Sequence, residues 1–392
     1  MSGIIVKPRS RIFHGHEWVY AAEIHKVFGN PEPGGIVSLK DFKDRPLGTA
    51  IYNPKSQIVA RRFSRHKETL DLEFFVRRLN RARARRERMP GMDLSLCRVV
   101  WSESDGMPGV VVDRYGPHFV VQTLTLAMDM RKDLLTQAIV QVFNAESVIE
   151  RNDSPIRIAE GLEQVTGVLH GKAPEPFRVA TTTGSFLIDP IGGQKTGIYL
   201  DQLDNYREAG TRAADRRVLD CFCNQGGFAL ACAAAGAVRV TAVDVSESAI
   251  ATARANAEVM GVADRIEFIV ANVFDYLKAQ ESAGATWDYI ILDPPSFTRN
   301  KKSVGDALRG YKEIHLRALK MLPNNGYLST YCCSHHVSTG EFRSVIHEAA
   351  VDAKKTLCQV GFHQQRLDHP ILSTVPETEY LRGYSYELLG AF

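Results

Sequence analysis

Four residues between positions 220 and 244 have the types and spacing of a site for a nucleoside-bearing ligand. Asp220 lies within a short apolar run typical of a buried strand, and Gly226 and Gly227 follow in a turn that lets the backbone pass close under a ligand. Asp244 ends the next predicted strand, 18 residues after Gly226. A carboxylate at that place can accept hydrogen bonds from two ribose hydroxyls.

The turn departs from the pattern that dinucleotides require. A pyrophosphate lies on a helix N-terminus behind Gly-x-Gly-x-x-Gly, but here the first glycine position is Asn224. A ligand without phosphate, such as S-adenosylmethionine, therefore fits better than a nicotinamide cofactor, and Asp220 can face its cationic methionine end. Asn272 follows the third predicted strand, where an adenine edge would be read. A sheet of this type without any cofactor is the structural alternative.

A rigid acidic turn follows the buried-strand pattern of residues 287–292. Pro294 and Pro295 fix φ at two consecutive residues and hold an extended lip after Asp293. Such a lip can stack against a planar base, with Phe297 as a second face. Asp293 can accept an exocyclic amine proton or, when protonated, donate to a ring nitrogen. The turn therefore predicts a site that holds a flat base.

Two cysteines, Cys332 and Cys333, follow the next predicted strand, residues 326–331. Carbon 5 of cytosine becomes nucleophilic only after a thiolate adds at carbon 6, so carbon methylation by this route needs a cysteine and amine methylation does not. A zinc site from Cys332 to His336 has poor spacing, because adjacent strand residues point to opposite faces.

Composition and charge bound the remaining possibilities. The hydrophobic fraction of 44% is that of a globular protein, and no apolar run could span a bilayer. The N-terminus lacks the apolar stretch of a secretory signal, and seven scattered cysteines indicate a reducing, cytoplasmic compartment. Residues 1–90 hold 19 Lys and Arg against 9 Asp and Glu, whereas the rest of the chain holds 29 against 36. This asymmetry favours contact between the front of the chain and a polyanion.

The front of the chain reads as a β-rich unit followed by a basic helix. Short strand-like runs at residues 36–39, 47–52 and 58–63 are separated by turn residues. A helix is predicted over residues 71–88, with one apolar stripe and seven arginines. The alternative to RNA contact is a solvated helix face. The candidate RNA contacts are Arg77, Arg78, Arg81 and Arg85.

Two further regions complete the chain. Residues 97–180 indicate a second α+β unit, with strands near 99–102, 109–113, 119–124 and 147–150 and a helix over 131–143. From about residue 185, strands alternate with helical patterns, which predicts a parallel sheet with helices on both faces.

With these motifs in hand, the chain resembles a family over nearly its whole length: bacterial S-adenosylmethionine-dependent 23S rRNA cytosine-5 methyltransferases that carry an N-terminal PUA domain. Family-like stretches occur at residues 15–20, 192–202, 220–228, 293–297, 309–313 and 333–334, of which the Gly-Gln-Lys-Thr-Gly block is the most specific. Two departures concern cysteines. Ser296 stands where related two-cysteine families have one, and Cys332 stands where this family usually has serine.

The resemblance implies an architecture. It consists of a β-barrel PUA RNA-binding domain (residues 1–72), a central α+β domain with the arginine-rich helix (73–182) and an S-adenosylmethionine-dependent methyltransferase domain (183–392). The last is expected to be an α/β, Rossmann-like class I fold with a mostly parallel seven-stranded sheet. The implied partner is 23S ribosomal RNA and the implied assembly a homodimer, without membrane or metal.

The resemblance also assigns roles to residues. Cys333 is the implied nucleophile, and Asp293 orients the base. The RNA base contacts are Pro294, Pro295 and Phe297. The donor contacts are Tyr199, Gln202, Asp220, Phe222, Gly226, Gly227, Phe228, Asp244, Asn272 and Asp293.

Three hypotheses remain open at this point. The first is a cytosine-5 rRNA methyltransferase with a cysteine adduct. The second is an RNA amine methyltransferase of the same fold, in which Cys332 and Cys333 are core residues. The third is an RNA-binding assembly factor with a vestigial sheet, against which the intact set of acids and glycines speaks.

Overall fold

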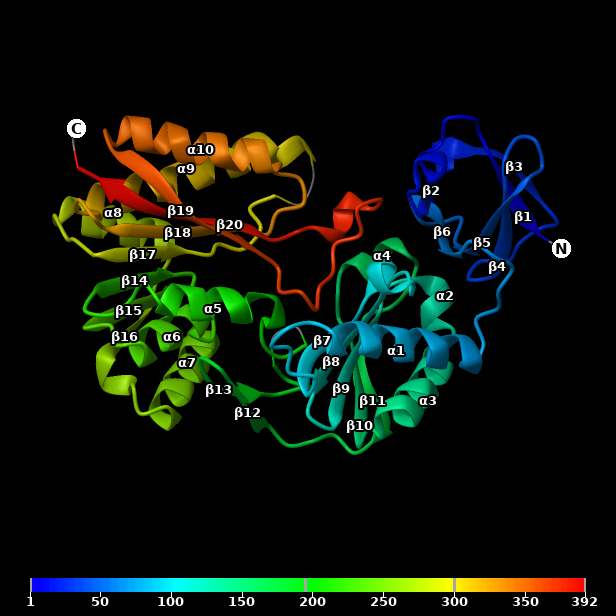
Figure 1. The fold of residues 1–392 in the computed structure, drawn as a ribbon, viewed down its shortest axis with the longest axis horizontal. Coiled ribbons are helices and arrows are strands. Elements are labelled where there is room, and N and C mark those ends of the chain that lie inside the picture. The colour runs from blue at the N-terminus through cyan, green and yellow to red at the C-terminus, as the bar shows by residue number, and fades with distance from the viewer. Residues whose placement is uncertain (1, 194–195, 299–300, 391–392) are drawn as a thin grey trace. The chain divides into compact units, whose positions relative to one another are not determined.

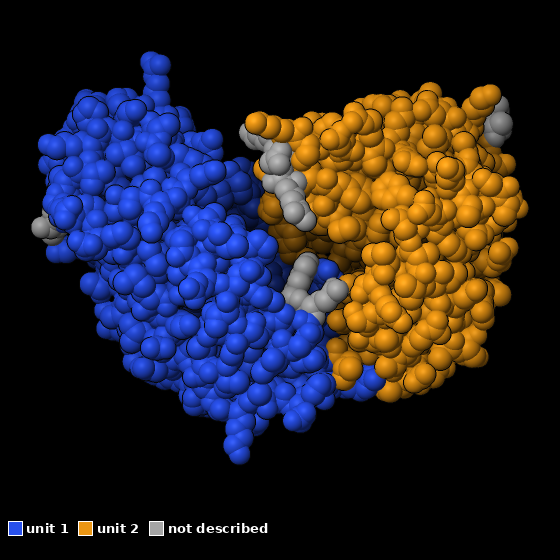
Figure 2. Space-filling model, turned by 180° about the vertical axis from the view of Figure 1, so that it is seen from behind, with its two compact units in different colours: residues 1–179, 188–200, 367–378 blue, residues 180–187, 201–366, 379–392 orange. Residues whose placement is uncertain are grey.

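The structure is a computed structural model that describes residues 2–193, 196–298 and 301–390. The chain forms two compact units, which Figure 2 colours separately. Unit 1 comprises residues 1–179, 188–200 and 367–378, and unit 2 comprises residues 180–187, 201–366 and 379–392. Gln194 and Lys195 of the family-like block lie outside the described residues.

Unit 1 opens with a six-stranded sheet in the order β2-β6-β5-β4-β1-β3 (Figure 1). Its strands are β1 Gly3–Val6, β2 Trp18–Tyr20, β3 Ile24–Phe28, β4 Ile36–Lys40, β5 Pro46–Tyr52 and β6 Ile58–Ser64. The sequence predicts β4, β5 and β6, but not β1, β2 or β3. Alternate residues such as Val37 and Leu39 are buried, so one face of the sheet covers an apolar core.

The second part of unit 1 is α+β, as predicted. Helix α1, Leu72–Glu87, begins at Asp71, whose carboxylate accepts a hydrogen bond from the Phe74 amide at 2.8 Å. A five-stranded sheet follows in the order β11-β10-β9-β8-β7. Its strands are β7 Leu96–Trp101, β8 Val110–Tyr115, β9 His118–Thr123, β10 Ser147–Asn152 and β11 Val165–Gly171. The helices are α2 Leu126–Asp129, α3 Lys132–Phe143 and α4 Ile156–Ala159.

Unit 2 is built on a seven-stranded sheet in the order β16-β15-β14-β17-β18-β20-β19. Its strands are β14 Arg217–Cys221, β15 Arg239–Asp244, β16 Ile266–Val270, β17 Tyr289–Leu292, β18 Tyr327–Cys332, β19 Thr356–Gln364 and β20 Arg382–Leu389. Strands β14 to β18 are parallel, whereas β20 runs antiparallel to both β18 and β19. The expected class I fold with a mostly parallel sheet is confirmed. A short two-stranded sheet precedes it, made of β12 Phe177–Thr181 and β13 Gly184–Ile188.

Helices cover both faces of the unit 2 sheet, with α5, α6 and α7 on one face and α8, α9 and α10 on the other (Figure 1). They are α5 Leu203–Gly210, α6 Gly227–Ala234, α7 Glu247–Val259, α8 Val273–Ser282, α9 Val304–Met321 and α10 Thr339–Asp352. Helix α7 begins at Glu247, because Ser246 caps it by accepting a hydrogen bond from the Ala249 amide at 3.2 Å.

The topology brings the chemistry-bearing residues to one edge of this sheet. The carboxyl ends of β14, β15, β17 and β18 lie at the same edge because the four strands are parallel and adjacent in the order. Asp220, Asp244, Asp293 and Cys333 all lie at or directly after these ends. A ligand at that edge can therefore meet all four.

Candidate active site

The turn between β14 and α6 follows a backbone path that few residues adopt. Phe222 (φ 64°), Asn224 (φ 48°) and Gly226 (φ 85°) all take left-handed conformations, which is uncommon for residues other than glycine. Gly227 has a different reason to be glycine, since a Cβ there would lie 2.3 Å from the Tyr206 ring. Gly226 thus serves the turn and Gly227 the close approach of α5, while both leave the backbone open toward a ligand.

Asp220 is a buried carboxylate with one oxygen satisfied. Its Oδ2 accepts a hydrogen bond from the Ala229 amide at 2.9 Å, and Oδ1 has no hydrogen-bond partner among the described residues. Burial raises the pKa of Asp220 well above its usual range, and the negative charges of Asp293 and Asp244 add to the effect. An uncompensated buried carboxylate is stabilised by a cation, so the methionine end of S-adenosylmethionine fits this position.

Asp244 is held rigidly at the end of β15. Its Oδ1 accepts from the Ser246 amide and its Oδ2 from the Asn224 amide, both at 2.9 Å. Each carboxylate oxygen has a second lone pair, so ribose hydroxyls can still donate to it.

Asn272 has a structural role in addition to its predicted contact with the donor. Its Oδ1 caps helix α8 by accepting from the amides of Phe274 at 2.9 Å and Asp275 at 3.4 Å.

The two phenylalanines predicted to contact the donor lie in packed surroundings. The Phe228 ring is buried between Tyr206 and Tyr331, at centroid distances of 4.7 and 5.0 Å. Only its backbone, at the start of α6, is therefore suited to a ligand. Phe222 is half-buried, and its ring lies 6.2 Å from that of Phe297. Tyr199 belongs to unit 1, and its donor contact stays a prediction.

The turn that follows β17, residues 293–297, is called the acceptor turn. Its first residue, Asp293, forms hydrogen bonds with two other segments of unit 2. Its amide donates to the Cys221 carbonyl at 3.4 Å, and its Oδ2 accepts from Nε2 of Gln202 at 3.0 Å. Pro294 is buried and Pro295 is exposed, so one proline anchors the lip and the other presents it to solvent. The Phe297 ring lies 4.8 Å from that of Tyr311, so part of its surface is used in packing.

The structure separates the two adjacent cysteines. Cys332 is the last residue of β18 and is fully buried in the apolar core. Cys333 is half-buried, and its Sγ lies 3.7 Å from the carbonyl oxygen of Pro294. Of the two thiols, Cys333 therefore faces the acceptor turn. His335 is exposed, with its ring 6.0 Å from that of Tyr380.

A group of hydroxyls joins the acceptor turn to the cysteine loop. Ser296 Oγ lies 2.9 Å from Ser334 Oγ, which in turn lies 3.2 Å from the buried Tyr311 hydroxyl. Ser296 also donates to the Thr298 carbonyl at 2.8 Å. Ser296 therefore holds the turn, in the place where related families have a cysteine. The motif around Tyr311 points to this region from the sequence, but not to the bond that Tyr311 makes.

Comparison with known proteins agrees with this geometry. A family model described as S-adenosylmethionine-dependent methyltransferase matches residues 162–370, and one described as PUA-like domain matches residues 4–65. The protein named ribosomal RNA large subunit methyltransferase I from Vibrio vulnificus (strain CMCP6) is 38% identical over 391 residues, covering 98% of each chain. Its namesake from Aliivibrio fischeri (strain MJ11) is 38% identical over 94% of each chain.

The chain belongs to the S-adenosylmethionine-dependent methyltransferase family.

Solved structures agree on the fold of this methyltransferase. A protein from Streptococcus mutans described as a SAM-dependent methyltransferase has a TM-score of 0.85 at 22% identity, covering 99% of this chain and 100% of its own. A solved methyltransferase complexed with SAH has a TM-score of 0.86 at 24% identity, with the same coverage. The methyltransferase binds S-adenosylmethionine as its methyl donor, which matches the half-satisfied carboxylate of Asp220.

The arginine-rich helix of this methyltransferase is less open to solvent than its sequence suggests. Arg78 donates to the Phe63 carbonyl at 2.8 Å, and Arg85 donates to the Ser104 carbonyl at 2.7 Å. Arg86 is fully buried and pairs with Asp105 through both guanidinium nitrogens, at 2.7 and 2.8 Å. Much of the helix's positive charge is therefore used inside unit 1.

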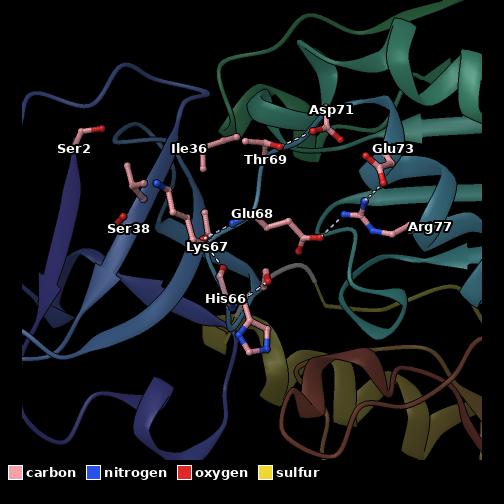
Figure 3. A pocket seen from close by; sticks show the side chains of 13 residues that line it. Ser2, Ile36, Ser38, His66, Lys67, Glu68, Thr69, Asp71, Glu73 and Arg77 are labelled. Carbon is pink, nitrogen blue, oxygen red and sulfur yellow. Dashed lines mark hydrogen bonds and ion pairs between the residues drawn. The ribbon is translucent and has the colours of Figure 1, made fainter.

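The other two predicted RNA contacts on α1, Arg77 and Arg81, differ in their interaction partners. Arg77 is exposed but pairs with Glu68 at 2.7 Å and with Glu73 at 3.3 Å. It lines a cavity of about 760 Å³, together with Lys67 and residues of β4, β5 and the segment before α1 (Figure 3). Arg81 is exposed, and its side chain makes no ion pair or hydrogen bond with the described residues. Among the four predicted RNA contacts, Arg81 is thus the most available.

Among the helices of the described residues, none is long and apolar enough to cross a membrane. Within the same residues, no group of three or more His, Cys, Asp or Glu side chains could hold a metal ion.

Proposed function

We propose that this protein methylates carbon 5 of a cytosine in 23S ribosomal RNA through a covalent adduct with Cys333. The single observation that carries the proposal is the position of the Cys333 thiol, 3.7 Å from the Pro294 carbonyl of the base-holding turn, while Cys332 is buried in the core. An amine methyltransferase has no need of a thiol at that place.

The residues of the site divide the chemistry among them. The Cys333 thiolate adds to carbon 6 of the cytosine, and the electrons of the carbon 5–carbon 6 double bond move to carbon 5. Bound S-adenosylmethionine supplies an electrophilic methyl group, which carbon 5 takes. Removal of the carbon 5 proton by a base then restores the double bond and expels the thiolate. Throughout, Asp293 holds the polar edge of the ring, and the Pro294–Pro295 lip supports its face.

The ribosomal substrate is supported by the names of the relatives and by the basic front of the chain. Unit 1 offers a second feature suited to RNA. Phe13 and Phe42 are 37% and 46% exposed, and their ring centroids lie 6.5 Å apart. The Lys43 ammonium lies 5.8 Å from the Phe42 centroid. Exposed rings with cations beside them are suited to unstacked bases and their phosphates. The homodimer and the other predicted site residues remain part of the proposal.

A covalent trap tests the reaction directly. Ribosomal RNA containing 5-fluorocytosine cannot lose a proton from carbon 5, so the methylated adduct accumulates on the enzyme. We expect a stable protein–RNA adduct with the natural chain and with Cys332→Ala, but none with Cys333→Ala. An adduct that forms on Cys333→Ala would remove Cys333 from the mechanism. Methylation of an amine, seen by nucleoside analysis of the natural product, would replace the proposal by the second hypothesis.

A further inference from the structure

A chain of three polar side chains runs from α5 to the acceptor turn. Nδ2 of Asn205 donates to Oε1 of Gln202 at 2.6 Å, and Nε2 of Gln202 donates to Oδ2 of Asp293 at 3.0 Å. Asn205 also donates from Nδ2 to the carbonyl oxygen of Gln364 at 3.2 Å. Asn205 and Gln202 are 5% and 3% exposed, so water has little access to replace these bonds.

These hydrogen bonds can run in only one direction from donor to acceptor. A side-chain amide has a donor end and an acceptor end of nearly equal size, so Gln202 alone could turn either end toward Asp293. The backbone carbonyl of Gln364 can only accept, and it therefore fixes the NH₂ end of Asn205. That end requires the oxygen of Gln202, which leaves the NH₂ group of Gln202 for Asp293.

We propose that Asn205 is a positioning residue for methyl transfer. It fixes the orientation of the Gln202 amide so that Oδ2 of Asp293 receives a hydrogen bond and the carboxyl group is held in one rotamer. This inference rests on the proposed function in one respect, the contact between Asp293 and the base. It does not depend on which atom of the base is methylated.

Charged and titratable groups around Asp293 make such control useful. Asp220 is close enough for its pKa to be raised by the Asp293 charge, and Asp293 also raises the pKa of the buried Tyr331 hydroxyl. Cys333 faces the same turn through the Pro294 carbonyl. The Asp220 carboxylate disfavours a second negative charge on Asp293 because the two carboxylates repel each other, whereas the Gln202 donor favours it. Loss of the donor should therefore favour protonation of Asp293.

The test is the isosteric variant Asn205→Asp. A carboxylate at position 205 can only accept, so the Gln202 amide turns to donate to it and presents its oxygen to Asp293. We expect kcat for transfer of the methyl group to ribosomal RNA to fall about tenfold at neutral pH, the effect of losing one hydrogen bond to a carboxylate. We also expect the acid limb of the pH–rate profile to move to higher pH. Affinity for S-adenosylmethionine, measured by calorimetry, should change less.

A matched control separates positioning from mere packing. Asn205→Leu keeps the branched shape but imposes no polarity on Gln202, so it should reduce kcat less and leave the acid limb in place. Gln202→Glu presents an acceptor to Asp293 directly and should reproduce the shift if Asn205→Asp does not fold. A natural pH profile for both acidic variants would overturn the proposal, as would equal losses in Asn205→Asp and Asn205→Leu without a shift. Activity is measured as label transferred from the donor, so failure of the cytosine-5 assignment leaves this result interpretable.

Discussion

The Cys333 thiol, on the loop that follows β18, lies 3.7 Å from the carbonyl oxygen of Pro294. Because this carbonyl belongs to the turn that we propose holds the base, the thiol and the turn form a single structural element. The hydroxyl contact between Ser296 and Ser334, at 2.9 Å, closes the same element two residues after Pro294 and one residue after Cys333. The proposed nucleophile is thus fixed relative to the Pro294–Pro295 lip by contacts within unit 2.

The two cysteines should respond oppositely to substitution. Cys333→Ala is expected to abolish methyl transfer and to leave the melting temperature within about 1 °C, because a half-buried thiol contributes little to the core. Cys332→Ala should keep the activity but lose about 1 kcal/mol of unfolding free energy, because it leaves a small cavity among fully buried neighbours. Assays of label transfer and urea unfolding on both variants check this. Loss of transfer in folded Cys332→Ala would reverse the assignment.

Asp220 should show a trade-off between stability and donor binding. Its raised pKa means that an ionised Asp220 destabilises the donor-free protein, and the cost appears as pH rises above the ordinary pKa of an aspartate. We expect Asp220→Asn to raise the melting temperature of the donor-free protein at neutral pH. The same change should weaken S-adenosylmethionine binding at least tenfold, the cost of about one charged hydrogen bond.

The pH dependence of binding provides the control for Asp220. In the natural protein, affinity for the donor should fall with decreasing pH as Asp220 takes up a proton, because a neutral carboxyl no longer attracts the cationic methionine end. Asp220→Asn should lack this dependence. Calorimetric titration at several pH values measures both proteins, and equal slopes would show that Asp220 does not contact the donor.

The sequence predicted those parts of the site that follow from strand order. Asp220, Asp244 and Asp293 end apolar runs, and parallel strands place such ends at one edge whatever the details of packing. The hydrogen bonds between segments that are distant in the chain could not be predicted from the sequence. Gln202 and Asp293 are 91 residues apart, and the polarity of Asn205 depends on a backbone carbonyl of β19, a strand that the sequence pattern did not indicate.

The basic helix α1 shows the same limit of prediction, because the partners of its arginines could not be predicted from the sequence. The sequence counts the charges of α1 but cannot show that Arg86 meets Asp105, 19 residues away, and is buried with it. The RNA-binding surface predicted from the sequence therefore includes arginines whose side chains partly stabilise the fold instead. The exposed pair Phe13 and Phe42 was missed, because two isolated aromatic residues, one in a single-turn 3-10 helix and one in a turn, give no periodic signal.

RNA binding should separate exposed from internal groups of unit 1. Phe13→Ala with Phe42→Ala is expected to weaken RNA binding by about 1–3 kcal/mol per stacked base without changing its salt dependence. Arg81→Glu should weaken binding and reduce the slope of log affinity against log salt by nearly one unit, as expected when one phosphate contact is lost. Arg85→Glu is the matched control, because it should lower stability through loss of its Ser104 and Asp105 partners. Unchanged affinity in the double phenylalanine variant, measured by filter binding, would argue against this surface.

Two buried histidines should make unit 2 sensitive to mild acid. The His315 ring donates from Nδ1 to the Tyr311 carbonyl at 2.5 Å and accepts at Nε2 from the Thr330 hydroxyl at 2.8 Å. Burial lowers the pKa of His315 to about 4, and that of His363 to about 4 as well. The unfolded chain therefore binds more protons between about pH 6.5 and pH 4, so stability is complete above pH 6.5 and declines as pH falls through this window.

The size and the source of this acid effect can be separated. His315 alone should cost about 2 kcal/mol of unfolding free energy at pH 5 relative to pH 7.5. Asp220, with its raised pKa, acts in the opposite direction, so the measurement is best made in Asp220→Asn. Urea unfolding of that protein, with and without His315→Gln, gives the pH slope in each case. The slope should shrink when His315 is replaced, because glutamine can keep a hydrogen bond but takes up no proton. An undiminished slope would mean that other groups carry the acid sensitivity.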